Sequence, residues 1–369
     1  MSGGVNLDNK VKNIFSNSEV QVDCILIKNS DEPFIDNNFF YVTRLDKGLF
    51  EGSIAILYPD GNLELIVSEL EAETAKQVKA DIKSYKSKKE YNDILDRTIS
   101  SFKNIGLNFN GISHKDFDKL KYEFPKINFL DVSEAFQKSR LIKDELEIKL
   151  IKEACRISDN VMEKVPDILN IGMKEYELSA EIDYLMQKNG ADKSAFETIC
   201  SFGANSAEPH YSHGDKKLTQ GDFVLCDIGA CFRKYNSDIT RTFVFGKAST
   251  QQKEMHKIVL DAQKIAFETI NQGLKACDVH NKVKSFIDNS KFKDRFIHST
   301  GHSLGLAVHD GGARIGSDCE LELKENMVFT VEPGIYLPGY GGVRIEDDII
   351  IKKSKIEVLS KSPRELIEI

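Results

Sequence analysis

The chain has 369 residues, of which 41% are hydrophobic and 29% charged, and its formal net charge is -8. These fractions exclude a disordered or collagen-like chain, and the length predicts two or three domains. An acidic balance without a basic stripe argues against a nucleic-acid partner or an anionic membrane surface. No apolar run reaches the roughly 18 residues that a membrane span needs. Seven scattered cysteines favour a reduced, cytoplasmic setting over a disulfide framework.

Strand and helix patterns alternate over the first 135 residues. The expected elements, in chain order, are a buried strand at 22–27, two strands at 53–58 and 63–67 joined by the turn Pro59-Asp60-Gly61-Asn62, helices near 69–80 and 91–103, a strand at 105–109 and a helix that starts at Ser113. No cluster of catalytic residue types occurs in this part of the sequence. We therefore expect residues 1–135 to form a structural or oligomerising domain.

The charged stretch 136–146 is expected to link this domain to a second one over 147–369. Apolar residues then recur at helical spacing in four places, which are 146–162, 178–185 before Gly190, 255–270 before Gly273, and 279–287. Strand patterns fill the rest of this half. The fold class is therefore α+β, with helices packed against antiparallel hairpins, after a smaller α/β domain.

An internal repeat relates two parts of the second half. Segment 218–229 resembles the segment that lies 105 residues later, and both are apolar strands that end in an acid, one further residue and a glycine. The acids are Asp227 and Glu332. In each copy a return strand carries a second acid, Asp238 or Glu346. The repeat predicts two similar halves that face each other, each contributing two carboxylates to one centre.

Four converging carboxylates would repel one another and could not all stay ionised without compensation. Two divalent cations would neutralise them, and His302, in a loop between two glycines, would be a fifth ligand. A carboxylate-rich set with one imidazole suits Mn²⁺, Co²⁺, Fe²⁺ or Zn²⁺. Because paired ions lower the pKa of a bridging water and polarise a carbonyl, the expected reaction is metal-assisted hydrolysis.

The second half resembles the pita-bread metallopeptidases. The resemblance rests on five segments in the right order, CDIGA, YNSDITRT, IHSTGHSLGLAVHD, VFTVEPGIY and GGVRIEDD. That family includes prolidase (Xaa-Pro dipeptidase), aminopeptidase P, methionine aminopeptidase and the non-metal creatinase. The first 135 residues resemble, more loosely, the creatinase-type amino-terminal domain of prolidases and aminopeptidases P. The resemblance implies a pita-bread catalytic domain after a creatinase-like domain, and a homodimer.

The family's metal ligands carry over by this resemblance to five positions, Asp227, Asp238, His302, Glu332 and Glu346. Asp227 and Glu346 fall at the bridging positions. Asp238 would chelate one ion, and His302 with Glu332 would hold the other. The resemblance also implies that Glu332 acts as general base for the bridging water. Mn²⁺ and Co²⁺ are the expected ions, with Zn²⁺ and Fe²⁺ as alternatives.

Four further residues match family positions around the substrate, and Tyr336 lies close to them. His210 matches the histidine near the leaving amine, and His309 matches the one that steadies the peptide carbonyl and its oxyanion. His298 and Arg344 match positions around the proline pocket, and Tyr336 lies at the same wall. The Arg344 guanidinium can meet a substrate carboxylate bidentately or act as a counter-charge to the acids. Both roles are open on the sequence alone.

One loop departs from the family pattern, because many members carry His-Glu-x-Pro where this chain has His309-Asp310-Gly311-Gly312. The change affects contact with the substrate rather than the metals. The amino-terminal domain argues against methionine aminopeptidase, and the complete ligand set excludes creatinase. The resemblance therefore implies a dinuclear peptidase in which a bridging hydroxide attacks the bond between an N-terminal residue and proline.

The expected substrates are small peptides with proline at the second position. We expect the aminopeptidase P type, which accepts longer peptides, and prolidase, which accepts dipeptides, is the alternative. Two other readings are a catalytically silent pita-bread protein that binds peptides or proteins, and a di-metal hydrolase of a non-peptide amide or ester.

Overall fold

A computed structural model describes residues 7–369, and the chain divides into two compact units between Arg140 and Leu141. Residues 1–6 of the predicted first domain lie outside the described residues. The division falls inside the segment 136–146 that was predicted as a linker. Helix α6 (Ser133–Leu141) occupies the first part of that segment, because its Phe136 is buried while its charged side chains lie on the more exposed face.

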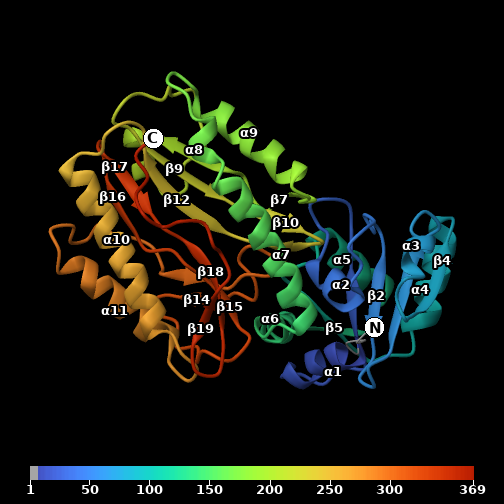
Figure 1. Ribbon diagram of the computed structural model, residues 1–369. Helices are drawn as coiled ribbons and strands as arrows, with labels where there is room; N and C mark the ends of the chain where they lie inside the picture. The colour runs from blue at the N-terminus through green and yellow to red at the C-terminus, as the bar shows by residue number, and fades with distance from the viewer. Residues whose placement is uncertain (1–6) are drawn as a thin grey trace. The chain divides into compact units, whose positions relative to one another are not determined.

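The N-terminal unit contains a six-stranded mixed sheet in the order β4-β3-β2-β1-β5-β6. The strands are β1 (Cys24–Lys28), β2 (Ile54–Leu57), β3 (Leu63–Ser68), β4 (Asp81–Tyr85), β5 (Asn104–Leu107) and β6 (Asn128–Asp131). The helices besides α6 are α1 (Leu7–Asn17), α2 (Asn37–Thr43), α3 (Ala72–Ala75), α4 (Lys88–Ile99) and α5 (His114–Glu123). Apolar residues of α4 and α5 bury one face of the sheet, which gives this unit its own core (Figure 1).

Most predicted elements of this unit are present, but the helix predicted near 69–80 is wrong. Only the single turn α3 forms there, and the chain then enters the edge strand β4, which pairs parallel to β3. The side chains of β4 are exposed or half-buried. An edge strand with charged residues lacks the apolar alternation by which a strand is recognised in a sequence.

The C-terminal unit combines helices with short antiparallel sheets. Its helices are α7 (Glu145–Met162), α8 (Val165–Ile168), α9 (Glu175–Lys188), the 3₁₀ turn η1 (Gly203–Ala207), α10 (Thr250–Thr269) and α11 (Ala276–Asp288). Its strands are β7 (Lys193–Ser194), β8 (Ile199–Phe202), β9 (Phe223–Ile228), β10 (Ala230–Phe232), β11 (Tyr235–Asn236), β12 (Ile239–Val244), β13 (Gly301–His302), β14 (Arg314–Ile315), β15 (Val328–Val331), β16 (Gly334–Leu337), β17 (Gly341–Arg344), β18 (Asp347–Ile351) and β19 (Ile356–Val358). Within residues 7–369, no helix is both long and apolar enough to cross a bilayer.

The internal repeat is visible in the strand pairing of this unit. Strand β9 pairs antiparallel with β12, and β15 pairs antiparallel with β18, with two short strands between the partners in each copy. Helices α7 and α9 pack on the first set of strands and α10 and α11 on the second, each pair with a separate apolar core (Figure 1). Both α7 and α10 begin with a capping box, and their first residues are also 105 positions apart. The repeat therefore includes helices as well as strands.

A buried ion pair connects the loop after His309 to the start of the C-terminal unit. The Nζ atom of Lys143 lies 3.2 Å from Oδ2 of Asp310, and the two side chains are 0% and 2% exposed. Lys143 belongs to the segment predicted as a linker, yet its backbone N–H donates to the carbonyl of Asn326 within the C-terminal unit. The charge at this position therefore anchors the chain instead of solvating a linker.

Replacing Lys143 by methionine should destabilise the chain by about 3 kcal/mol, because the buried Asp310 carboxylate loses a charged partner. Lys152→Met is the matched control, since Lys152 pairs with Glu357 at a largely exposed site. Denaturant unfolding of the two variants measures the difference. Equal stabilities for both variants would contradict this role of the buried pair.

His256 on α10 should make the stability of the chain depend on pH. Burial, and then the nearby Arg241 cation, lowers the pKa of His256 to about 4 from its usual 6.5. The folded chain keeps this imidazole neutral, whereas the unfolded chain binds a proton as the pH falls below 6.5. The unfolding free energy should therefore drop between pH 6.5 and 4, by on the order of 2–3 kcal/mol from this residue.

Denaturant unfolding at several pH values checks this expectation. His256→Gln should flatten the profile in that range, and His114→Gln, at an exposed position on α5, should leave it as in the wild type. A His256→Gln profile as steep as that of the wild type would assign the acid sensitivity to other groups.

Candidate metal centre

A cavity of about 600 Å³ in the C-terminal unit is lined by both copies of the repeat. Nine of the ten residues singled out from the sequence line it, namely His210, Asp227, Asp238, His298, His302, His309, Glu332, Arg344 and Glu346. The tenth, Tyr336, lies behind the wall. The structure thus brings together residues that are up to 136 positions apart in the sequence.

The four acids lie at equivalent places in the two copies of the repeat. Asp227 lies on β9 and Asp238 directly precedes β12, whereas Glu332 follows β15 and Glu346 directly precedes β18. Strand pairing brings Asp227 opposite Thr240, whose hydroxyl donates to Glu346 Oε2 at 2.6 Å. The ends of the paired strands β9 with β12 and β15 with β18 therefore hold the four carboxylates close together.

His302 completes this cluster from the neighbouring hairpin. Its Nε2 atom lies 3.5 Å from Asp238 Oδ2 and 3.6 Å from Glu332 Oε1. One ligand atom from each of Asp238, His302 and Glu346 falls within a mutual distance of 4.8 Å. A side chain at Gly301 would collide with the carbonyl of Thr330, so glycine is needed for the close approach of β13 to β15.

The negative charge of this carboxylate cluster is only partly compensated by the side chains around it. Burial, with the neighbouring carboxylates, raises the pKa of Asp238 and of Glu346 well above their usual range. Within residues 7–369, Oδ1 of Asp227 and Oδ1 of Asp238 are buried without a hydrogen-bond partner. Unpartnered buried carboxylate oxygens are costly in a protein and are the atoms that a hard divalent cation binds. The residues present therefore fit a carboxylate-held metal site.

Arg344 is a buried cationic side chain in contact with one of the four acids, Asp227. Its Nη2 lies 2.5 Å from Asp227 Oδ2, its Nε donates to Thr240 Oγ1, and its Nη1 donates to the hydroxyl of Tyr336. Only 4% of the side chain is exposed. Arg344 therefore forms a buried ion pair with Asp227, and each of its three guanidinium nitrogens has an acceptor within the chain.

Tyr336 connects Arg344 to His298. The Tyr336 hydroxyl accepts from Arg344 Nη1 and lies 2.9 Å from His298 Nε2. The other ring nitrogen, Nδ1, lies 2.8 Å from the carbonyl of Ser299, which can only accept, so Nδ1 carries the proton and Nε2 accepts from the hydroxyl. Burial lowers the pKa of His298 and raises that of Tyr336 to about 12, so both groups stay neutral. Tyr336 therefore supports the cavity wall from behind.

The two remaining predicted histidines line the open part of the cavity. The His309 ring meets the His302 ring edge to face, with centroids 4.2 Å apart, and burial lowers the pKa of His309. His210 is exposed at the rim. Cys226, beside Asp227, is fully buried in the apolar core opposite Cys200, as expected for a packing residue.

Sequence reasoning missed Arg314 and Asp348. Arg314 lines the cavity and lies opposite His302 in the β13–β14 hairpin, and it forms an exposed ion pair with Asp318. The turn Gly311-Gly312 before it could have indicated this return strand. Asp348 is buried, and its Oδ2 accepts from the backbone N–H of Asp238. Three acids follow one another at this position, Glu346-Asp347-Asp348, and the sequence did not indicate which of their side chains contact the site.

Comparisons with known proteins agree with this geometry. A family model described as Metallopeptidase family M24 matches residues 149–353, and one described as Creatinase/Prolidase N-terminal domain matches residues 14–142. A Xaa-Pro dipeptidase of Pyrococcus horikoshii is 40% identical over 312 residues, which are 85% of this chain and 88% of that protein.

Two solved structures have the same fold over nearly the full length. An Xaa-Pro dipeptidase from Bacillus anthracis has a TM-score of 0.91 at 32% identity and covers 99% of this chain and 100% of its own. An X-Pro aminopeptidase from Thermotoga maritima has a TM-score of 0.89 at 33% identity and covers 94% and 98%. The predicted fold class and the resemblance to the pita-bread metallopeptidases are confirmed. The chain is a metallopeptidase of family M24 that carries a creatinase/prolidase-type N-terminal domain.

Proposed function

We propose that this chain is an Xaa-Pro dipeptidase that works with two divalent cations. The observation that carries the proposal is the cluster of four carboxylates and His302 at one cavity. In the part of the chain that the structure describes, Oδ1 of Asp227 and Oδ1 of Asp238 in this cluster have no hydrogen-bond partner. The names of the relatives favour the dipeptidase alternative over the aminopeptidase P reading that the sequence first suggested. The homodimer and the cytoplasmic location stay predictions.

The proposed ligands are the five residues named from the resemblance, Asp227, Asp238, His302, Glu332 and Glu346. Mn²⁺ or Co²⁺ are the ions proposed, with Zn²⁺ or Fe²⁺ as alternatives. When bound, paired divalent ions supply a water of lowered pKa and polarise the scissile carbonyl. Asp227 and Asp238 each offer a free oxygen for this purpose.

The chain's own residues would then handle protons and orient the peptide. Glu332 is the proposed general base, and Thr330 Oγ1 donates to its Oε1 at 3.3 Å and so orients the carboxylate. His309, held neutral by burial, can donate a hydrogen bond to the peptide carbonyl as charge develops on it. His210, which lines the same cavity, is the proposed proton donor to the leaving amine.

A dipeptidase also needs a cation for the carboxylate of its substrate, and Arg314 is the better candidate. Arg344 already donates to Asp227, Thr240 and Tyr336. Arg314 lines the same cavity, and its partner Asp318 is 65% exposed, so that ion pair can open at little cost. A guanidinium can bind a carboxylate in the bidentate manner.

Product analysis on Ala-Pro and Ala-Pro-Gly-Gly tests the proposal. Chelator-stripped protein is loaded with Mn²⁺, Co²⁺ or Zn²⁺, and the released alanine is measured. We expect cleavage of Ala-Pro and little or no cleavage of the tetrapeptide, because Arg314 selects a carboxylate directly on the proline.

Glu332→Ala is the control for this assay, since it should abolish metal-dependent hydrolysis and leave the fold intact by circular dichroism. Cleavage of the tetrapeptide would restore the aminopeptidase P reading. No cleavage with any of the three metals would favour a silent peptide-binding protein or a hydrolase of another amide or ester. Wild-type rates in Glu332→Ala would contradict the site assignment.

Arg314→Gln should raise the KM for Ala-Pro about tenfold with little change in kcat, because the lost ion pair binds substrate and reacting complex alike. Arg156→Gln is the matched control, as Arg156 also pairs with a nearby acid, Glu153, on an exposed helix face. Steady-state kinetics separate the two constants. An unchanged KM in Arg314→Gln would remove this residue from the substrate site.

A further inference from the structure

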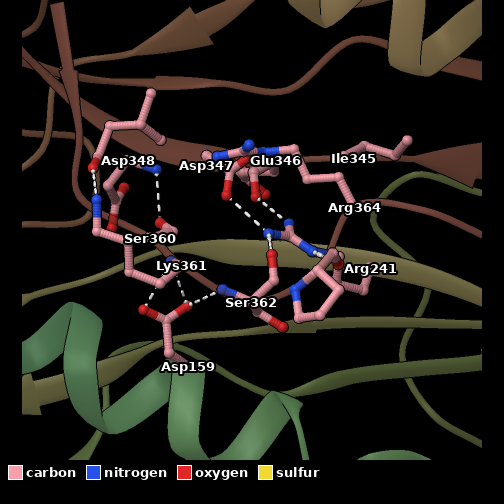
Figure 2. A network of polar contacts seen from close by, with 12 residues as sticks. Asp159, Arg241, Ile345, Glu346, Asp347, Asp348, Ser360, Lys361, Ser362 and Arg364 are labelled. Atoms are coloured by element: carbon pink, nitrogen blue, oxygen red, sulfur yellow. Dashed lines mark hydrogen bonds and ion pairs between the residues drawn. The ribbon is translucent and has the colours of Figure 1, made fainter.

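Residues 359–363, here called the C-terminal strap, lie between helix α7, which carries Asp159, and strand β18, which carries Asp348 (Figure 2). The strap is tied to β18, since the N–H of Leu359 donates to the carbonyl of Asp348 and the N–H of Asp348 donates to Ser360 Oγ. On its other side, Asp159 of α7 accepts from the N–H groups of Lys361 and Ser362, at 2.8 and 2.9 Å.

Arg241 joins this strap to the main chain of a proposed metal ligand. Its Nη2 and Nε donate to the carbonyls of Ser362 and Pro363, both at 2.7 Å. Its Nη1 donates to the carbonyl of Glu346 at 2.7 Å and to that of Thr240 at 2.9 Å. The side chain is 3% exposed, and the fifth contact is an ion pair with Asp347. All five guanidinium N–H groups are thus directed at fixed acceptors.

Thr240 connects this hydrogen-bond network to the Glu346 carboxylate. The Thr240 hydroxyl donates to Glu346 Oε2, and the Thr240 carbonyl accepts from the Glu346 N–H at 3.1 Å. Arg241 holds the carbonyls of the same two residues. Thr240 and Arg241 together therefore fix the position of both the backbone and the side chain of Glu346.

We propose that Arg241 is a positioning residue through which the C-terminal strap holds Glu346 in the geometry that binds the metal ions. The inference rests on the proposed metal site but concerns residues that touch neither metal nor substrate. Arg241 fixes the Glu346 backbone relative to β12, the strand that directly follows Asp238. The strap therefore belongs to the metal-binding machinery as well as to the fold.

Arg241→Lys tests this role, because lysine keeps the charge but presents one nitrogen in place of the five-donor fork. Calorimetric titration of chelator-stripped protein with Mn²⁺ or Co²⁺ alone measures binding without reference to activity. We expect metal affinity at least tenfold weaker than in the wild type. On Ala-Pro, kcat should fall with KM nearly unchanged, and excess metal should restore part of it.

Arg364→Gln is the matched control. Arg364 Nε also donates to Asp347, at 2.6 Å, and Gln263 still donates to the same oxygen after the change. This variant should lose some thermal stability and keep the wild-type metal affinity. If Arg241→Lys also binds metal like the wild type while losing stability, Arg241 is merely structural and the inference is overturned.

Asp159→Ala keeps the inference testable if Arg241→Lys does not fold. This change releases the strap from α7 and leaves Arg241 in place, so metal binding should weaken about threefold. Wild-type affinity in Asp159→Ala would overturn the role of the strap. A wild-type chain that binds no divalent cation would instead overturn the proposed metal site itself, so the two failures are distinguishable.

Discussion

Four carboxylates around one cavity repel one another, and the C-terminal unit must compensate this repulsion. Burial and the neighbouring charges together raise the pKa of Asp238 and of Glu346. A single buried guanidinium, Arg344, offsets part of this charge, and a hydroxyl, that of Thr240, stabilises one further oxygen. Among the described residues, the four acids still include two buried oxygens without a hydrogen-bond partner, Oδ1 of Asp227 and Oδ1 of Asp238. Bound divalent cations would neutralise the remaining charge.

Duplication explains how a chain can build such a pocket. Each copy of the repeat has its own helices and its own apolar core, so each can hold a pair of strands without help from the acids. The acids then lie at the strand ends, where the two copies meet. The energy that holds the carboxylates close together comes from burial of the apolar side chains in these two cores. Removal of a cation therefore costs binding and charge compensation, while the fold keeps its main source of stability.

The sequence predicted the parts of this design that follow from periodicity and from the repeat. Helices α7, α9, α10 and α11 bury clear apolar stripes, and the acids Asp227 and Glu332 follow matching apolar strands, so both were found. The edge strand β4 was missed because its residues are exposed or half-buried, and helix α6 was missed because two residues of its buried face are serines, Ser133 and Ser139, which weaken the apolar periodicity. Arg314 and Arg241 were missed for another reason. The roles proposed for them depend on partners that are distant in sequence, and one arginine in a strand resembles any other.

The protonation state of His298 and His309 also limits the positive charge in the cavity. Burial lowers the pKa of both His298 and His309, so these imidazoles add no positive charge to the cavity at neutral pH. A protonated ring at either place would compete with a cation for the carboxylates. A neutral ring can still donate one hydrogen bond and accept another, as His298 does between Ser299 and Tyr336. Among residues 7–369, Arg344 is the buried cationic side chain that lines this cavity, and the remaining carboxylate charge is left available for metal ions.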